Sequence, residues 1–197
     1  RYACEYLLNE RGIHWKDSRF FIGRQHRDPQ SKKWFARLIL PVYKDGDLIF
    51  YTVRDLTGTR PKKYMSPDTP RDNVLYGFDH LTHDTTDPIY VVEGWFDAFH
   101  IKGVAVFGNK MTANQLMWLN RCSRPKVIIP DRFGDGHLLA YQALDQGWSV
   151  STPDIGDCKD VNDAIVKYGA IYTTMSIKNH TYTGFEGRIH VDTYCRK

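Results

Sequence analysis

The second half of the chain alternates between short apolar runs and amphipathic stretches. The apolar runs are rich in Val and Ile and predict strands at residues 89–94, 104–108, 126–130 and 148–153. The stretches that follow them have helical spacing and predict helices at residues 95–101, 113–121, 137–146 and 161–169. Thr112 and Asp160 stand at N-cap positions, and Gly147 and Gly169 stand at helix ends. Strands and helices that take turns with short connections predict a parallel sheet flanked by helices.

The two ends of the chain have weaker patterns. Residues 1–13 predict a short amphipathic helix that ends at Gly12, and the polar stretch 17–33 predicts an exposed loop. After Ile171 the periodicity fades, and the segment 188–195 is interpreted as a terminal strand.

A hairpin is predicted in the first half. Two β-rich runs at 36–43 and 48–56 are separated by a turn that contains Asp45-Gly46, and such a dipeptide between strand patterns is typical of a tight hairpin. Pro41 lacks a backbone N–H, so the first strand is expected to be broken or to lie at a sheet edge.

Length and hydropathy restrict the class of protein. The chain has 197 residues, 42% of them hydrophobic, which is enough to bury a core in one domain or two small ones. No apolar run approaches the roughly 18 residues that span a bilayer, and no secretory signal is recognisable. We therefore expect a soluble chain with no membrane partner.

Charge is distributed unevenly. Residues 1–80 carry 15 Lys and Arg against 10 Asp and Glu, whereas residues 81–197 carry 12 against 13. A basic half is consistent with nucleic-acid contact, although an ordinary solvated basic face is the commoner explanation for an excess of this size.

The four cysteines argue against zinc. Cys4, Cys122, Cys158 and Cys195 are far apart, and no C-x-x-C pair supplies the close ligand spacing of small zinc sites. We expect unpaired thiols in an intracellular chain and no zinc.

Three acids follow the predicted strands of the second half. Glu93 follows the first strand, Asp131 the third, and Asp160 lies in the loop after the fourth. Loops at the carboxyl ends of parallel strands converge, so the carboxylates are expected to lie close together, where they repel unless a cation such as magnesium neutralises them. The alternative is that each acid caps the following helix, which suits Asp160 best.

A magnesium site of this kind implies a phosphate compound as substrate, because the ion completes its coordination with water and phosphate oxygens. Two such ions can activate a 3′-hydroxyl and stabilise a pyrophosphate leaving group, or activate water to cut a phosphodiester. The carboxylates alone leave both reactions open.

These residues carry a family resemblance. Glu93-Gly94 after a strand, with Asp97 three residues on and Asp131 after a later strand, resembles the Toprim domain of DnaG-type primases, topoisomerases and some nucleases. The first half narrows the choice, because three of its segments are similar in order and spacing to the primase RNA-polymerase domain: YLLNERGI with FFIGR, ARLILPVYKDGDLIFYTVRDL, and KKYMSPDTPRDNVLYGFDHL. The resemblance covers about 170 of the 197 residues and is closest to bacteriophage primases.

The resemblance implies an α/β fold in which a Toprim domain at residues 87–175 follows a smaller basic α+β subdomain at residues 1–86. Residues 176–197 form an extension of unknown role. The implied activity is that of a nucleotidyltransferase, a DNA primase that uses Mg²⁺ or Mn²⁺ to synthesise short RNA primers on single-stranded DNA during DNA replication.

The resemblance also implies roles for individual residues. Glu93, Asp131 and Asp160 match catalytic acids, and Glu93, Asp131, Asp135, Asp160 and Asn162 form the implied metal-binding set. Nucleotide and template contacts are expected at Arg37, Arg54, Lys63, Tyr64 and Lys110, because arginine and lysine pair with phosphates and tyrosine stacks on bases. For Lys110, which follows a strand, a simple turn is an equal alternative.

Two positions depart from the family pattern. Phe133 stands where the family has the second acid of its D-x-D motif, and Asn162 replaces a later acid. Either Asp135 serves as the second ligand through a reshaped loop, or the metal site is weakened or lost.

The implied partners are single-stranded DNA, NTPs, a replicative helicase, and a zinc-binding module on another segment or chain. The expected location is the cytoplasm, that of the host if a phage encodes the protein. Two rivals stay open: a Toprim-type metal-dependent nuclease, and a non-catalytic primase-derived module that binds nucleic acid in the replisome. The second rival would suit the Phe133 substitution.

Overall fold

The fold is that of a computed structural model, which describes residues 2–17, 20–23, 34–68 and 70–196. Most of the predicted loop at 17–33 lies outside the described residues. The chain divides into two compact units, Arg1–Pro70 and Arg71–Lys197, which we describe separately. No helix in the described part is both long and apolar enough to cross a membrane.

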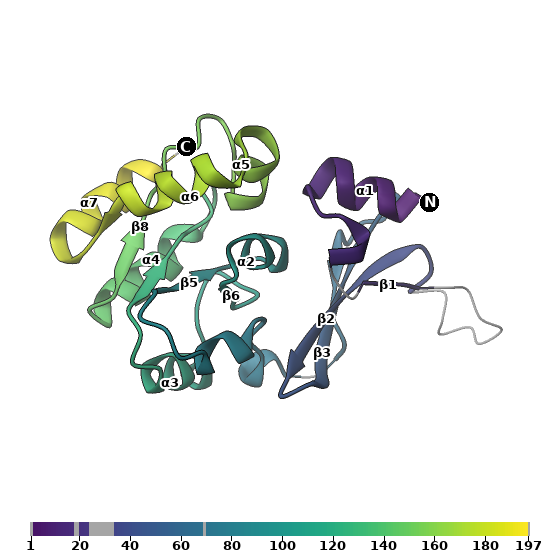
Figure 1. The fold of residues 1–197 in the computed structure, drawn as a ribbon, viewed down its shortest axis with the longest axis horizontal. Helices are drawn as coiled ribbons and strands as arrows, with labels where there is room; N and C mark the ends of the chain where they lie inside the picture. The colour runs from purple at the N-terminus through teal and green to yellow at the C-terminus, as the bar shows by residue number, and fades with distance from the viewer. Residues whose placement is uncertain (1, 18–19, 24–33, 69, 197) are drawn as a thin grey trace. The chain divides into compact units, whose positions relative to one another are not determined.

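The first unit is an antiparallel sheet with one helix. Helix α1 (Tyr2–Arg11) buries Ala3 and Leu7, and a short 3₁₀ turn follows it. The strands pair in the order β1-β2-β3-β4. Their bounds are Phe21–Ile22 for β1, Arg37–Lys44 for β2, Asp47–Asp55 for β3 and Tyr64–Met65 for β4 (Figure 1).

The predicted hairpin is confirmed as the centre of this sheet. Asp45 and Gly46 have φ of 52° and 86°, so both central residues of the β2–β3 turn are left-handed, as a type I′ turn requires. Strand β2 continues through Pro41, which pairs with Tyr51, and the pairing of β1 stops at Ile39. Pro41 therefore lies beyond the end of β1, where its missing N–H breaks no strand ladder.

The second unit contains a five-stranded sheet in the order β6-β5-β7-β8-β9. Its strands are β5 (Ile89–Val92), β6 (Val104–Ala105), β7 (Lys126–Ile128), β8 (Ser149–Ser151) and β9 (Thr181–Tyr182). The first four strands along the chain run parallel to one another, and β9 pairs antiparallel with β8. The predicted parallel sheet is confirmed, with an unpredicted antiparallel strand at one edge.

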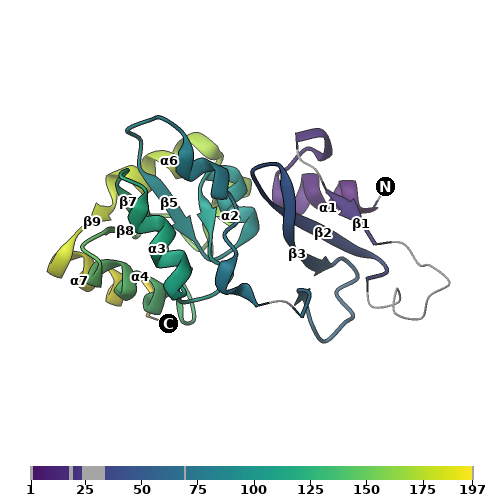
Figure 2. The same ribbon diagram turned by 90° about the horizontal axis from the view of Figure 1, so that it is seen from below.

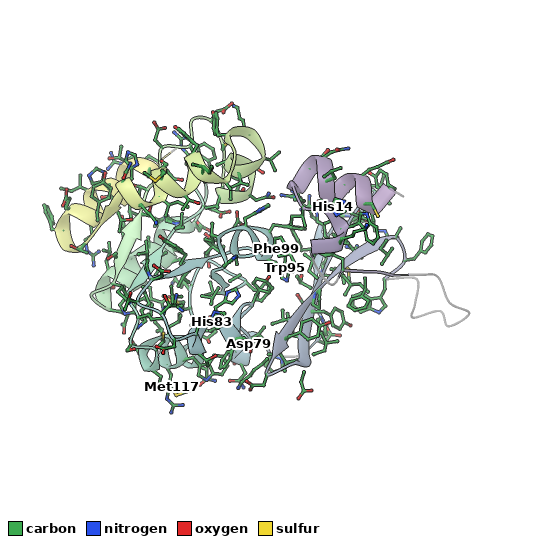
Figure 3. All side chains as sticks on the ribbon, in the orientation of Figure 1. His14, Asp79, His83, Trp95, Phe99 and Met117 are labelled. Atoms are coloured by element: carbon green, nitrogen blue, oxygen red, sulfur yellow. The ribbon has the colours of Figure 1, made fainter. Side chains whose placement is uncertain are left out.

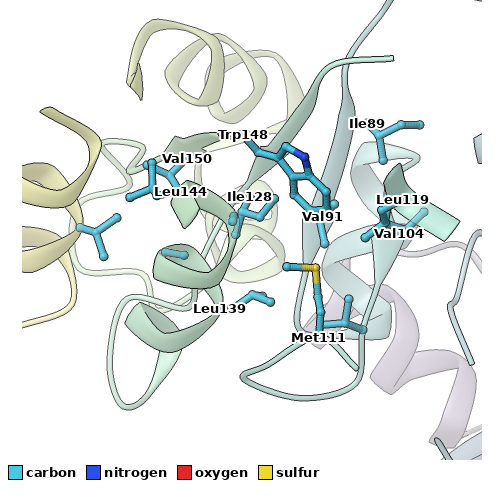
Figure 4. Close-up of a cluster of buried hydrophobic side chains, with 14 of the residues drawn as sticks. Ile89, Val91, Val104, Met111, Leu119, Ile128, Leu139, Leu144, Trp148 and Val150 are labelled. Atoms are coloured by element: carbon cyan, nitrogen blue, oxygen red, sulfur yellow. The ribbon is translucent and has the colours of Figure 1, made fainter. Parts of the chain in front are cut away.

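Helices cover both faces of this sheet (Figures 1 and 2). Their bounds are α2 (Trp95–Ile101), α3 (Ala113–Arg121), α4 (Gly136–Asp145), α5 (Val161–Tyr168), α6 (Ala170–Asn179) and α7 (Gly184–Tyr194). Alternate strand residues point to opposite faces, so Val91 packs with α3, α4 and α7 (Figure 4) whereas Val92 packs with α2, α5 and α6.

The predicted helix ends are confirmed. Thr112 and Gln115 form a capping box at the start of α3, and Gly147 (φ 75°) and Gly169 (φ 87°) follow α4 and α5 with backbone angles that favour glycine.

The strand predicted near the C-terminus is wrong. Residues 188–195, expected as a strand, lie in helix α7 and its C-cap, because Gly187, Val191 and Cys195 are buried at four-residue spacing. The expected boundary at 175/176 falls inside α6, so the segment 176–197 is part of the second unit and not an appendage.

The compact units meet at Pro70, 16 residues before the boundary expected at 86/87. Residues 71–86 belong with the second unit because Leu75 lies in its core and Tyr76 forms an isolated β-bridge with Ala105.

Candidate active site

Glu93 lies at the carboxyl end of β5 in an unfavourable place for a carboxylate. Its Oε1 is buried and has no hydrogen-bond partner within the described residues. Burial, followed by the negative charge of Asp131, raises the pKa of Glu93 to about 7, although Lys159 opposes this shift. A buried anionic oxygen without a donor is expected to bind a cation or a proton.

The helix after Glu93 is held by aromatic packing. Trp95 and Phe99 stack on α2 with ring centroids 5.2 Å apart (Figure 3), and Tyr76 packs against Trp95 at 4.7 Å. Gly94 lets the first turn of this helix approach closely, because a Cβ at position 94 would lie 2.5 Å from Asp97 Oδ2. These contacts fix the position of the Glu93 backbone.

Asp97 joins two of the loops at this edge. Its side chain is buried, and Oδ1 accepts a hydrogen bond from the backbone N–H of Asn162 at 2.8 Å. Burial, with the charges of Asp160 and Asp131, raises the pKa of Asp97 well above its usual range. Asp97 therefore ties the start of α2 to the start of α5.

Asp131 follows β7 and makes an ion pair. Lys159 Nζ lies 2.9 Å from Asp131 Oδ2, in a pair whose lysine side chain is about half exposed. Gly136 permits the tight loop that follows, because a Cβ there would lie 2.4 Å from the Asp131 carbonyl oxygen. Burial lowers the pKa of Lys159, but the hydrogen bond and charge of Asp131 outweigh it, so the net shift is upward.

Asp160 caps helix α5, as the alternative interpretation of this acid predicted. Its Oδ1 accepts a hydrogen bond from the backbone N–H of Asp163 at 2.9 Å. Its charge still acts on two neighbours, since it helps to raise the pKa of Asp97 and of Lys159. Asp160 thus has a structural role and also contributes negative charge to this edge.

Asn162 is buried and has structural contacts. Its backbone N–H binds Asp97, and its Nδ2 lies 3.2 Å from His100 Nε2. The Asn162 side chain is therefore paired with a histidine on the neighbouring helix.

The loop after Asp131 presents exposed side chains. Asp135 stands at the N-cap position of α4, is exposed, and makes no capping hydrogen bond with its side chain. Phe133 is 39% exposed. The structure does not bring Asp135 into a metal-binding group, although its charge contributes to the raised pKa of Glu93.

Over the residues that the structure describes, no three His, Cys, Asp or Glu side chains are positioned to hold a metal ion. The charge of Asp131 helps to raise the pKa of Glu93 and of Asp97, and Lys159 supplies the positive charge next to Asp131. The site is therefore a group of neighbouring carboxylates in which Lys159 pairs with Asp131.

In the first unit, Arg54 and Tyr64 form a stacked pair. The Arg54 guanidinium carbon lies 4.7 Å from the Tyr64 ring centroid and 5.9 Å from that of Tyr6. Arg54 is 9% exposed, and its Nε has no hydrogen-bond partner within the described residues, whereas Tyr64 is 44% exposed. A buried arginine thus underlies an exposed ring.

The other predicted contact residues differ in exposure. Arg37 is buried and donates to the Lys62 carbonyl oxygen at 3.1 Å; burial and the charge of Arg60 lower its pKa. Lys63 and Lys110 are exposed, the latter in the loop after β6. Of this set, Lys63, Tyr64 and Lys110 are the most accessible side chains.

The sequence analysis did not predict the ion pair of Lys159 or the buried hydrogen bond of Asp97. Lys159 directly precedes Asp160, and this position next to a predicted site acid is the one sequence feature that points to it. Its contact with Asp131 depends on the pairing of β7 with β8, which brings the two loops together.

No model of a known protein family matches the chain, and no curated protein sequence matches it. The RNA polymerase domain of Mycobacterium tuberculosis primase DnaG, in complex with double-stranded DNA, matches with a TM-score of 0.76 at 18% identity, over 98% of this chain and 83% of that one.

Two further solved structures agree. A DnaG catalytic core matches with a TM-score of 0.72 at 19% identity, over 95% of this chain and 75% of that one. A DnaG primase catalytic domain bound to single-stranded DNA matches with a TM-score of 0.62 at 21% identity, over 94% and 67%. The predicted fold class, a helix-flanked sheet preceded by a smaller α+β subdomain, is confirmed: this chain has the fold of the DnaG primase catalytic core.

Proposed function

We propose that this chain is the catalytic core of a DNA primase, which synthesises short RNA primers on single-stranded DNA during replication. The observation that carries the proposal is that Glu93, Asp131 and Asp160 all follow neighbouring parallel strands, where the charge of Asp131 helps to raise the pKa of Glu93 and the charges of Asp160 and Asp131 help to raise that of Asp97. In this proposal the second unit is a Toprim domain. The basic side chains of the first unit would contact the phosphates of the template and the nucleotide.

Glu93 and Asp131 offer the oxygen ligands that a divalent cation prefers, although the described residues form no three-ligand group. The buried Glu93 Oε1 has no donor, and burial and repulsion from Asp131 disfavour its charge, so a hard cation between these two carboxylates would relieve both effects. Glu93 and Asp131 would hold Mg²⁺ or Mn²⁺, with Asp160 and Asp97 adding negative charge nearby. When bound, the metal would supply activation of the 3′-hydroxyl and stabilisation of pyrophosphate.

Lys159 has a defined part in this proposal. In the absence of a cation it neutralises Asp131 at 2.9 Å, and its half-exposed side chain can turn away when that carboxylate is needed. The released ammonium group would then be available to pair with an NTP phosphate.

Replacing Lys159 by Met is therefore expected to tighten Mg²⁺ binding by about 3- to 10-fold, because a competing positive charge is removed. Isothermal titration calorimetry measures this change. Lys167→Met is the matched control, since Lys167 pairs with the exposed Asp157 and should leave the affinity unchanged. Unchanged or weaker binding in Lys159→Met would show that the lysine does not compete with the metal.

Template binding is proposed for the first unit. One similar solved structure is a DnaG catalytic domain bound to single-stranded DNA, and here Tyr64 exposes a ring that Arg54 supports from beneath. Aromatic rings bind unpaired bases by stacking, and arginine and lysine neutralise the backbone.

Tyr64→Ala is expected to weaken binding of a labelled single-stranded oligonucleotide by about 5-fold or more, as loss of one stacked base predicts. Fluorescence anisotropy at a fixed salt concentration measures the affinity. Tyr64→Phe retains the ring and should bind normally, and Tyr172→Ala removes another exposed tyrosine on α6 as a control. Equal affinity of Tyr64→Ala and wild type would exclude a stacking role.

The proposal is tested by incubation with single-stranded DNA, labelled NTPs and Mg²⁺. Short RNA products support a primase, whereas degradation of nucleic acid without NTPs supports the nuclease alternative. A non-catalytic module is the second candidate. The described residues contain no group of three side chains that could hold a metal ion, and Asp135, the expected second ligand, is exposed. Such a module would give neither reaction, even with a primase zinc module added. A zinc-binding module and a replicative helicase are proposed partners.

A further inference from the structure

The loop between β7 and α4 carries an arginine and an exposed phenylalanine beside the acidic site. Arg132 and Phe133 directly follow Asp131, and Phe133 is 39% exposed. The backbone N–H of Arg132 donates to the Lys159 carbonyl oxygen at 2.9 Å. This bond ties the loop to the segment that carries Lys159 and Asp160, so the two side chains start from a fixed backbone.

The Arg132 guanidinium packs against two aromatic rings. Its central carbon lies 5.6 Å from the Phe133 ring centroid and 5.7 Å from that of Tyr194. Tyr194 is anchored at the end of α7 and packs against the core cluster that contains Val191. Packing of this kind restricts a long side chain and so reduces the ordering cost when it binds a ligand.

The charge of this guanidinium is not neutralised locally. Over the described part of the chain, no carboxylate lies within ion-pair distance of Arg132, although Asp131 precedes it and pairs with Lys159 instead. An arginine held against aromatic rings with its charge available is suited to bidentate contact with a phosphate. The exposed ring beside it is suited to a planar base.

We propose that Arg132 and Phe133 form a nucleotide-binding subsite, in which Phe133 stacks on a base and Arg132 pairs with a phosphate. The inference rests on the proposed function only for the choice of a nucleotide, since any compound with a planar base and a phosphate has the required chemistry. The nucleotide can come from free NTP or from a strand.

Binding in EDTA tests the subsite without any metal. Anisotropy is measured with a fluorescent ATP analogue and, in a second arm, with a labelled single-stranded oligonucleotide, so that the two sources are distinguished. We expect Phe133→Leu and Arg132→Gln each to weaken binding of one of these probes by about 5-fold or more. Phe133→Trp retains a stacking ring and is expected to bind like wild type.

Phe185→Leu is the matched control, because Phe185 is 78% exposed on α7 and has no part in the subsite. Circular dichroism confirms that each variant is folded, and normal binding by Phe133→Trp shows that position 133 tolerates change. Wild-type affinity of Phe133→Leu and Arg132→Gln for both probes would overturn the subsite, as would an equal loss in Phe185→Leu.

Failure of the subsite and failure of the proposed function give different results. A protein that synthesises RNA, but whose two variants bind both probes normally, retains the function and loses the subsite. A protein that makes no RNA, but loses nucleotide binding in Phe133→Leu and Arg132→Gln, retains the subsite and loses the function.

Discussion

Glu93→Gln is expected to reduce primer synthesis by at least about 100-fold, the scale on which loss of one group that stabilises the transition state acts. Glutamine keeps the size of the side chain and removes its charge, so the proposed cation would lose a buried ligand. Asp131→Asn removes the second proposed ligand and should have a similar effect. Incorporation of labelled NTPs on single-stranded DNA measures both.

Asp145→Asn is the control for these substitutions. Asp145 ends α4, is exposed, and pairs with Arg188, so its replacement should leave synthesis unchanged. Wild-type activity in Glu93→Gln would show that catalysis does not pass through this carboxylate.

Glu93→Gln is also expected to make the metal-free protein more stable than wild type above neutral pH. The pKa of Glu93 is raised to about 7 in the fold, above the ordinary value of 4.5, so the folded state binds the proton more tightly than the unfolded state. The stability associated with the protonated form is complete below about pH 4.5 and is lost as pH rises through 7. The loss amounts to about 3 kcal/mol.

Chemical denaturation in EDTA at pH 5, 7 and 8.5 measures this effect. Wild type should lose stability toward pH 8.5, Glu93→Gln should lose less of it, and added Mg²⁺ should restore wild type but not the variant. The remaining slope in the variant is assigned to Asp97, whose pKa is also raised by burial. Identical pH profiles for wild type and Glu93→Gln would contradict the claim that burial in the fold raises the pKa of Glu93.

The order of strands and helices in the second unit was predictable because each element carries a local signal. Thr112 and Gln115 lie three residues apart and can form a capping box wherever the helix is placed. Asp45-Gly46 determines its turn in the same way, through backbone angles that few other pairs adopt.

Helix α7 was missed because its signal is tertiary. The segment is rich in residues that favour strands, and the spacing of Gly187, Val191 and Cys195 identifies a helix only once their burial is known. Packing against α4 and β8 overrides the local preference.

The candidate site was predictable in its acids but not in its contacts. Glu93 and Asp131 stand at strand ends, which local pattern reveals. The bond from Asn162 to Asp97 joins residues 65 positions apart, and the pair of Lys159 with Asp131 depends on strand order. The sequence also does not reveal that the Phe133 ring packs against the Arg132 guanidinium, since that contact depends on the fold of the loop.

The most direct test of the central claim is the anomalous scattering of Mn²⁺ in crystals of the protein. We predict a peak between the carboxylates of Glu93 and Asp131, with Lys159 Nζ moved away from Asp131, and no peak in Glu93→Gln. Crystals that show no such peak, from protein that still incorporates ribonucleotides with Mn²⁺, would contradict the proposal that these two acids hold the catalytic cation.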